Sequence, residues 1–481
     1  MTDLTLLPAA RMAALVRRRT VSPVELVQAH LDRIERLNPP LNAFVTVDAA
    51  RALQEARALE QAITGSRQPP APLGPLAGVP VSIKSSIDIA GLRTETGTRL
   101  RAGCIAAEDA PLVARLRRAG AIVLGNTNAP ELLMSYETDN LIYGRTNNPW
   151  NLERTAGGSS GGESAAIAAG LSAGGVGSDG GGSIRVPAHF TGICGLKPTP
   201  GRVPATGHFP AALGPFALLG VVGPMARTVA DMALLFEALA GPDDGDTSSA
   251  PVSACHWDPA EVKATVIGYF EDDGRTPVTP ETRAAVRAAA EALAGAGFET
   301  RPFRPAGLDR AHDLWWVLFG QAGGFILRPT VAGHEEEISP ILREFLGWVE
   351  AEPPLTVARL MQAWLGRDEL RLSLLAEMRD VPVFLCPACS IPAFRHGERE
   401  WAIEDQTVRY LRPPDVMTYT QWFNLLGNPA MVVPAGRSPE GLPIGIQVVG
   451  RPYEEERILA VAAEIERELG GYQPPPLAFG S

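Results

Sequence analysis

From Thr155 to Pro198 the chain reads TAGGSSGGESAAIAAGLSAGGVGSDGGGSIRVPAHFTGICGLKP, and this stretch organises the rest of the sequence. Two glycine-flanked serine clusters, residues 157–162 and 180–183, lie on either side of a run of small residues. Glycine lets other groups approach the backbone closely, so two such clusters indicate a place where the main chain meets a ligand. Serine in this setting can be a turn residue or a nucleophile.

Three interpretations of the serine clusters compete. A phosphate cradle is disfavoured because the chain has neither a G-x-x-x-x-G-K-[ST] loop nor a G-x-G-x-x-G turn after a strand. Tight packing of small residues explains the alanine and glycine content, but not two serines that are each ringed by glycine. A serine hydrolase explains both, with Ser183 as the nucleophile. The backbone N–H groups of Gly180, Gly181 and Gly182 would then be free to form an oxyanion hole.

The base for such a serine is predicted to be an amine. The seven histidines form no convincing pair with a serine, and the G-x-S-x-G elbow is absent. The chain has only three lysines, at positions 84, 197 and 263, and Lys84 follows the alternating apolar residues of a predicted strand. Burial disfavours the ammonium form, so a lysine that emerges from a hydrophobic strand can act as a neutral base.

The composition describes a packed globular protein. Of its 481 residues, 45% are hydrophobic and 20% are charged, and the formal net charge of −11 disfavours a nucleic-acid surface. The N-terminus lacks the order of segments of a signal peptide, and no segment approaches the roughly 20 apolar residues of a membrane span. We therefore expect a cytoplasmic protein with no membrane or nucleic-acid partner, present as a monomer or a homodimer.

The five cysteines indicate a reducing compartment rather than a disulfide framework, because they are odd in number and scattered along the chain. Cys386 and Cys389 form a C-x-x-C, but no second Cys or His pair lies nearby. The motif also follows an apolar run that is typical of a buried strand. No metal and no organic cofactor is expected.

Alternation of strand and helix patterns predicts an α/β fold. Residues 1–65 are predicted to be a helical segment, in which Ser22-Pro23-Val24-Glu25 is a capping box. A Pro- and Gly-rich linker follows over residues 68–75. Residues 66–481 contain strand–helix–strand patterns without a break into independent domains, and residues 131–136 are predicted to be helical. We expect one α/β domain with the N-terminal helical segment packed on it.

Two segments are expected to shape a substrate pocket. Residues 201–224 are rich in Gly, Pro and Phe and are predicted to be a loop that walls it. Residues 306–380 are predicted to be a helical insert near the substrate cleft, with some of its large aromatic side chains lining the cleft. The large aromatic residues of the insert are Trp315, Trp316, Phe319, Phe325, Phe345, Trp348 and Trp364.

The sequence resembles the amidase signature family of serine amidohydrolases. The run GGSSGGESAA…GSDGGGSIRVPA…GICGLKPT carries the resemblance, which extends over roughly residues 10–470. Further matching segments are GVPVSIK at 78–84, NNPWN at 147–151, GPMARTVAD at 223–231 and GLPIGIQ at 441–447. The resemblance implies that family's fold, a central twisted mixed β-sheet covered on both faces by α-helices.

The resemblance also implies a Ser–Ser–Lys triad and its mechanism. Ser183 matches the acylated nucleophile, and Lys84 matches the general base. Ser159 matches the bridging serine, which the family resemblance places after a cis peptide bond from Gly158. In that mechanism a neutral Lys84 draws a proton through Ser159 from Ser183 and later returns it to the leaving nitrogen.

The neighbours of the nucleophile carry two further expectations. Asp179 and Arg185 are expected to form a structural salt bridge rather than to act in catalysis. The chain departs from the family at Gly180, where Thr or Ile is common, and at Ser85, where Asp is common. The first departure predicts a more flexible oxyanion loop. Neither change removes a member of the triad.

We expect an amidohydrolase that cleaves the C–N bond of a small or medium carboxamide, anilide or carbamate through an acyl-enzyme. The main alternative is the glutaminase subunit of tRNA-dependent amidotransferases, which the family includes. The aromatic residues of 306–380 and the Phe- and Leu-rich residues 208–219 favour an apolar acyl or aryl group over glutamine. A urethanase or esterase uses the same triad, and a non-catalytic binding module is disfavoured because all three triad residues are present.

Overall fold

A single large mixed β-sheet forms the centre of the computed structural model, which describes residues 3–65 and 73–477. In spatial order its strands are β1 (Phe44–Val47), β3 (Ile122–Thr127), β2 (Pro80–Lys84), β6 (Gly174–Asp179), β8 (Val221–Ala226), β7 (Cys194–Lys197), β14 (Ala430–Arg437), β15 (Pro443–Val449), β11 (Val383–Pro387), β9 (Ile267–Tyr269) and β10 (Thr300–Pro302). β2 runs parallel to β3 and β6, whereas β6, β8, β7, β14, β15 and β11 pair antiparallel in turn. The sequence-based prediction of a mixed sheet is confirmed.

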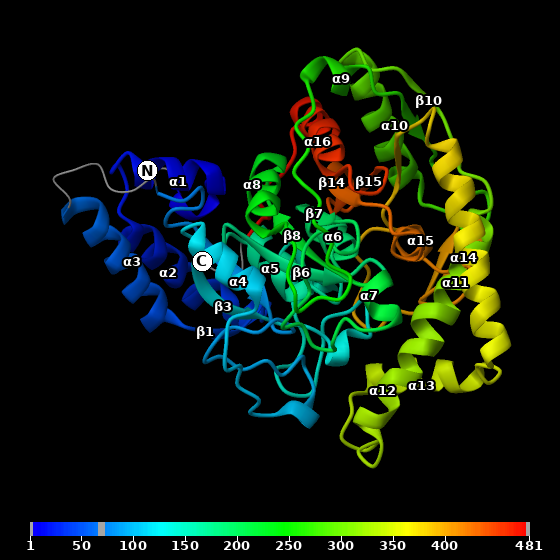
Figure 1. Ribbon diagram of the computed structural model, residues 1–481, viewed down its shortest axis with the longest axis horizontal. Coiled ribbons are helices and arrows are strands. Elements are labelled where there is room, and N and C mark those ends of the chain that lie inside the picture. The colour runs from blue at the N-terminus through cyan, green and yellow to red at the C-terminus, as the bar shows by residue number, and fades with distance from the viewer. Residues whose placement is uncertain (1–2, 66–72, 478–481) are drawn as a thin grey trace.

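Helices cover both faces of this sheet, as predicted (Figure 1). On β14, Met431 and Val433 belong to a core shared with helices of one face, whereas Val432 between them packs with helices of the other face. The first face is covered by α1 (Ala9–Arg17), α4 (Pro111–Arg118), α8 (Val229–Leu239), α10 (Pro280–Gly295) and α16 (Glu455–Leu469). The second face is covered around the site by α5 (Gly161–Ala168) and α6 (Arg185–Thr191).

The N-terminal residues form helices and also contribute the edge strand β1 (Figure 1). α2 (Pro23–Leu41) begins at the predicted capping box, in which Ser22 accepts from the N–H of Glu25 while the Glu25 carboxylate accepts from the N–H of Ser22. α2 packs against α3 (Ala49–Gly65), and apolar residues of both helices share a core with β3. Most of the predicted linker, residues 68–72, lies outside the described residues.

The segment 306–380 is helical, as predicted, and forms the side of the molecule opposite the N-terminal helices (Figure 1). Its elements are α11 (Ala311–Trp315), a π-helical turn (Trp316–Gln321), α12 (Ala322–Val331), α13 (Pro340–Ala351) and α14 (Val357–Glu377). α11 and α14 both pack on α15 (Thr418–Leu426), which follows the small hairpin of β12 (Glu400–Ile403) and β13 (Gln406–Arg409). This packing brings the insert to the edge of the sheet where β6 ends.

The carboxyl ends of β2 and β6 meet at one edge of the sheet, because the two strands are parallel neighbours. Lys84 is the last residue of β2, and Asp179 is the last residue of β6. The second serine cluster follows β6 directly. Open α/β sheets bind ligands at the carboxyl ends of their strands, and the predicted site residues gather at this edge.

Candidate active site

Lys84 lies at this sheet edge with its side chain fully buried. Its Nζ is 2.6 Å from Ser159 Oγ and 3.0 Å from the Oγ atoms of both Ser160 and Ser178. Three hydroxyl groups therefore surround the amine. Two of them, those of Ser159 and Ser178, belong to residues that also line a pocket.

The environment of Lys84 favours its neutral form. Burial lowers its pKa from 10.5 to about 7, although the negative charges of Asp179 and Glu163 act in the opposite direction. An amine with this pKa is uncharged in a large fraction of molecules near neutral pH. It can then accept a proton from a neighbouring hydroxyl group.

Ser159 follows a cis peptide bond from Gly158, as the family resemblance predicts. A Cβ atom on Gly158 would lie 2.6 Å from the carbonyl oxygen of Ser135, so the close approach of the two chain segments requires glycine here. The next residue, Ser160, donates its backbone N–H to the carbonyl oxygen of Ser183 at 3.1 Å. The two serine clusters are therefore joined by a main-chain hydrogen bond.

The turn before Ser183 contains backbone donors in residues that line the pocket. The N–H groups of Gly180, Gly181 and Ser183 have no hydrogen-bond acceptor among residues 3–65 and 73–477. The N–H of Gly182 is different, because it donates to Asp179 Oδ1 at 2.7 Å. The expectation that all three glycine N–H groups are free is therefore wrong for Gly182. The N–H of Ser183, which the sequence-based prediction omits, is free instead.

Asp179 and Arg185 form the predicted salt bridge, and both side chains are completely buried. Arg185 Nη2 lies 2.9 Å from Asp179 Oδ1, and its Nε donates to Oδ2 at 3.0 Å. The backbone N–H of Ile184 donates to the same Oδ2 at 3.0 Å. Burial acts to raise the pKa of Asp179, but the charge of Arg185 and these hydrogen bonds hold it at about 2. The carboxylate is thus ionised and fully engaged in holding the turn.

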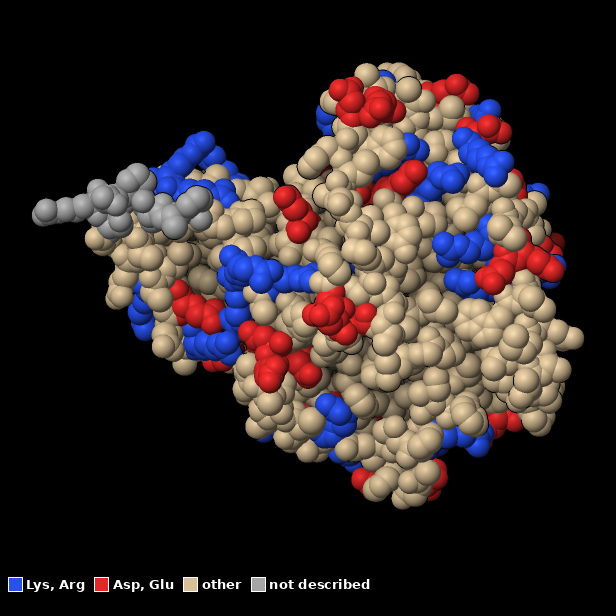
Figure 2. All heavy atoms as spheres, viewed as in Figure 1, with Lys and Arg blue, Asp and Glu red and all other residues tan. Residues whose placement is uncertain are grey.

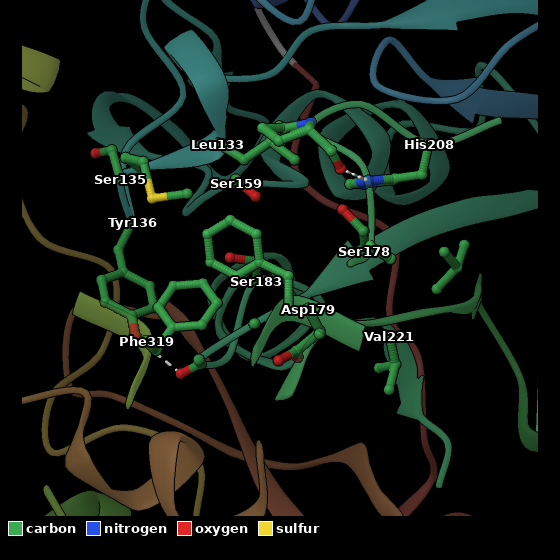
Figure 3. A pocket seen from close by; sticks show the side chains of 18 of the residues that line it. Leu133, Ser135, Tyr136, Ser159, Ser178, Asp179, Ser183, His208, Val221 and Phe319 are labelled. Atoms are coloured by element: carbon green, nitrogen blue, oxygen red, sulfur yellow. Dashed lines mark hydrogen bonds between the residues drawn. The ribbon is translucent and has the colours of Figure 1, made fainter. Parts of the chain in front are cut away.

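A pocket opens beside the two serines, and side chains from several distant segments converge on it (Figure 3). Its empty volume, including the open mouth, is about 770 Å³. The residues that line it are Leu133, Met134, Ser135, Tyr136, Ser159, Ser178, Asp179, Gly180, Gly181, Ser183, Ala205, His208, Pro210, Ala212, Phe216, Gly220, Val221, Val222, Trp315, Phe319, Phe345 and Leu411. Only Asp179 and His208 in this set are ionisable below pH 9, and burial lowers the pKa of His208 to about 4.

Both predicted pocket segments contribute to this lining. The segment 201–224 walls the pocket, but it is not all loop, because it contains the short helix α7 (Pro215–Leu219) and the start of β8. Among the aromatic residues of the insert, Trp315, Phe319 and Phe345 line the pocket. Phe325 instead is 73% exposed on α12.

The sequence-based prediction misses the segment from Leu133 to Tyr136. The sequence predicts a helix over residues 131–136, but the structure has only a 3₁₀ turn at Glu131–Leu133. Leu132 and Leu133 have φ angles of +49° and +67°, so the backbone leaves the helical path there. The change of direction turns Met134 and Tyr136 to the pocket.

Other candidate groups lie away from the pocket lining. Cys386 and Cys389 are buried at the end of β11, and burial is the main cause that raises the pKa of both thiols. Within residues 3–65 and 73–477, no group of three or more His, Cys, Asp or Glu side chains could hold a metal ion.

None of the described helices is both long and apolar enough to cross a membrane. On the face shown in Figure 2, basic and acidic side chains are interspersed.

Comparisons with known proteins agree with this site. The Amidase family matches residues 25–459. Human fatty-acid amide hydrolase 2 is 34% identical over 503 aligned residues, which cover 98% of this chain and 91% of that protein. A glutamyl-tRNA(Gln) amidotransferase subunit from Salinispora arenicola is 35% identical, with 99% of this chain and 100% of that protein covered. The crystal structure of a bacterial aryl acylamidase is similar with a TM-score of 0.82 and 28% identity, and the match covers 96% of each chain.

The fold and these relatives show that this protein is a hydrolase of the class that cleaves amides. Within that class, the chain belongs to the amidase signature family. The resemblance found in the sequence is therefore confirmed over nearly the whole length of the chain.

Proposed function

We propose that this protein hydrolyses neutral amides and anilides with an apolar acyl group, using Ser183 as the nucleophile, Ser159 as the proton relay and Lys84 as the base. The observation that carries the proposal is the 2.6 Å contact between Lys84 Nζ and Ser159 Oγ, at the edge of a pocket that Ser183 also lines. A serine nucleophile requires a base that removes its proton, and a buried amine with a pKa of about 7 can accept a proton at neutral pH.

The proposed reaction uses one proton relay in both directions. Neutral Lys84 takes the proton of the Ser159 hydroxyl, and Ser159 takes the proton of the Ser183 hydroxyl. At the same time, Ser183 Oγ attacks the carbonyl carbon of the substrate. The carbonyl oxygen becomes an oxyanion, which the three free N–H groups of Gly180, Gly181 and Ser183 can stabilise. Protonated Lys84 then returns the proton through Ser159 to the leaving nitrogen as the C–N bond breaks. A water molecule then attacks the carbonyl carbon of the acyl-enzyme and gives its proton to Lys84 through Ser159. The proton returns to Ser183 Oγ as the ester bond breaks, which releases the acid and restores Ser183.

The pocket chemistry supports an uncharged substrate. Glutamine carries an α-carboxylate and an α-ammonium group, and burying either without a charged partner is costly. The side chains that line the pocket include no Lys or Arg, and the one carboxylate, Asp179, is already paired with Arg185. Aromatic and aliphatic side chains instead offer contacts to an apolar acyl or aryl group. This disfavours the role of a glutaminase subunit, despite the 35% identity to an amidotransferase component.

Carbamates and esters remain secondary candidates. Both present a carbonyl carbon to the same nucleophile and need the same oxyanion stabilisation. Their leaving groups are better than an amine, so the proton returned by Lys84 is less important for them. We expect aryl carbamates and esters of apolar acids to be cleaved alongside amides.

Turnover of a substrate panel tests the proposed function. The panel contains an anilide of an apolar acid, an aliphatic amide, an aryl carbamate and glutamine. We expect the anilide to be cleaved and glutamine to remain at background. Ser183→Ala should lower turnover by at least about 10⁴-fold, because no nucleophile remains.

Ser164→Ala is a matched control for that variant. The Ser164 hydroxyl is also buried, but its hydrogen-bond partners are the carbonyl oxygens of Gly161 in α5 and of Ala156, which precedes α5. We expect this control to retain turnover. We also expect a fluorophosphonate to label the peptide that contains Ser183, as detected by mass spectrometry. Glutamine cleavage without anilide cleavage, or full turnover by Ser183→Ala, would overturn the proposed function.

A further inference from the structure

The direction of each free N–H in the turn before Ser183 is set by the carbonyl group of the same peptide unit. In a trans peptide the N–H and the C=O point in opposite directions. A donor that binds the carbonyl oxygen therefore fixes where the N–H of the next residue points. The carbonyl oxygens of Asp179, Gly180, Gly181 and Gly182 all accept a hydrogen bond.

Two of these carbonyl groups are held by side chains from distant segments. Asn424 Nδ2, on α15, donates to the Asp179 oxygen at 2.9 Å and thereby orients the N–H of Gly180. Trp315 Nε1, on α11, donates to the Gly180 oxygen at 2.9 Å and orients the N–H of Gly181. The N–H of Ser183 is oriented within the turn, because Val186 N–H donates to the Gly182 oxygen. Both oriented glycine N–H groups lack an acceptor among the described residues.

The Gly181 carbonyl accepts two hydrogen bonds, and the N–H of the same peptide unit is the one that is not free. Tyr136 donates its hydroxyl to this oxygen at 2.8 Å, and Thr420 donates its hydroxyl at 2.7 Å. The N–H on the other side of that peptide belongs to Gly182 and is directed to Asp179. The turn thus has a separate anchor for every peptide unit, and among these anchors Trp315 alone comes from the insert.

Trp315 fits the turn because of the residue type at position 180. Its side chain is 2% exposed, and its ring stacks on Phe319 with a centroid distance of 5.1 Å and an interplanar angle of 15°. A Cβ atom on Gly180 would lie 2.4 Å from the Phe319 ring, and one on Gly181 would lie 2.6 Å from the Trp315 ring. Threonine or isoleucine at position 180, which is common in the family, would displace this pair of rings.

The departure at Gly180 therefore has a compensation in the insert. The sequence predicts a more flexible oxyanion loop at this point. The structure shows an aromatic pair on the open side of the glycine and an indole N–H on its carbonyl. The ring of Phe319 and the indole N–H of Trp315 thus support the turn at position 180, where other members of the family commonly have a side chain in the turn itself.

We infer that Trp315 is a positioning residue of the oxyanion hole: its indole N–H holds the Gly180–Gly181 peptide so that the N–H of Gly181 faces the oxyanion. This role rests on the proposed function, because it needs an oxyanion formed at Ser183. Trp315 acts through the backbone and does not take part in proton transfer. The helical insert would then contribute to the rate of the reaction as well as to the shape of the pocket.

Trp315→Phe tests the role of the indole N–H. Loss of one oxyanion donor lowers kcat by about 10²–10³-fold in other hydrolases, and loss of its anchor should lower kcat by about 10–100-fold. The affinity for an apolar boronic acid, whose adduct with Ser183 is tetrahedral, should fall in proportion. Trp316→Phe is the matched control, because the neighbouring indole makes no hydrogen bond to the described residues of the turn and its ring packs on Phe345.

A second variant separates the hydrogen bond from the shape of the ring. Benzothienylalanine at position 315 alone keeps the bicyclic ring and replaces the indole N–H by sulfur. We expect kcat to fall as in Trp315→Phe while KM stays within about twofold, since the lining of the pocket is unchanged. Fluorophosphonate labelling of Ser183 confirms that each variant is folded and has its nucleophile.

The outcomes distinguish this inference from the proposed function. If both Trp315 variants match Trp316→Phe in kcat and in boronate affinity while Ser183→Ala is inactive, the positioning role is wrong and the proposed function stands. If KM rises and kcat is unchanged, Trp315 only shapes the pocket, and the positioning role is again wrong. If Ser183→Ala keeps full turnover, the proposed function fails whatever the Trp315 variants do.

Discussion

Two buried lysines in this protein have the same solvent exposure and different surroundings. Lys84 at the end of β2 and Lys197 at the end of β7 are both 0% exposed, and burial lowers the pKa of each to about 7. Lys84 meets three serine hydroxyls, whereas Lys197 donates to the carbonyl oxygen of Pro198 at 2.9 Å. Burial is the main cause of the lowered pKa of both amines, so a lowered pKa does not by itself identify the base. A base also needs a hydroxyl partner that faces a pocket.

Replacing each lysine by methionine should give the largest difference between the two sites. Lys84→Met removes the proposed base and should lower kcat/KM for an anilide by about 10²–10⁴-fold. Lys197→Met removes an amine whose contact is a main-chain oxygen, and an apolar side chain of similar length can fill the same buried volume. We expect kcat/KM to stay within about threefold of the unchanged protein.

Circular dichroism and thermal unfolding of both variants serve as the control for this pair. Two folded variants with the opposite pattern of activity would assign the base to Lys197. Two folded variants with equal activity would show that neither amine takes part in proton transfer.

The pH profile gives a smaller effect that is specific to Lys84. The proposed base acts in its neutral form, and its pKa is about 7. Its deprotonated fraction rises with pH through that value, so kcat/KM should fall by about tenfold per pH unit well below pH 7 and level off above it. Measurements between pH 5 and 9 in buffers of constant ionic strength check the direction. A profile that rises toward acid would contradict a neutral lysine as the base.

Glu163→Gln should give the smallest effect, a shift of the acidic limb of that profile. Glu163 is buried and accepts hydrogen bonds from Ser82 at 2.5 Å and Thr127 at 2.6 Å. Its negative charge acts to raise the pKa of Lys84. Removing the charge should move the limb to lower pH by less than about one unit.

The pKa of Glu163 itself is raised to about 7, mainly by burial, so the two groups titrate in the same range. The Gln variant therefore also decides which group causes the limb. A limb that shifts belongs to Lys84, and a limb that disappears belongs to Glu163. A limb that keeps its position would show that the two groups are not coupled.

The reacting groups could be predicted from the sequence, because they lie in short stretches with an unusual composition. The glycine-ringed serines and the lysine after an apolar strand are local patterns, and the mixed sheet follows from alternating strand and helix signals. The cis bond before Ser159 follows from the family resemblance alone. The salt bridge between Asp179 and Arg185 is also local, since the two residues are six positions apart in the chain.

The anchors of the glycine turn could not be predicted, because most of them are single polar groups on otherwise ordinary helices. Trp315 and Thr420 have the spacing of core residues, and nothing in the sequence relates them to position 180 or 181. The sequence places Tyr136 in a helix that the structure replaces with a 3₁₀ turn. Tertiary packing decides these positions, and the only local sign of it is the glycine at position 180.

The burial of two of the three lysines has a practical consequence for attaching the protein to a surface. Lys263, the last residue of α9 (Pro259–Lys263), is the one lysine whose side chain reaches solvent, and its Nζ lies 4.3 Å from the centre of the Phe298 ring. α9 is at the top of Figure 1, well away from α7 beside the pocket. Of the three lysine side chains, only that of Lys263 would therefore be accessible to a lysine-directed resin or dye, so modification of lysines would leave the buried Lys84 of the site intact.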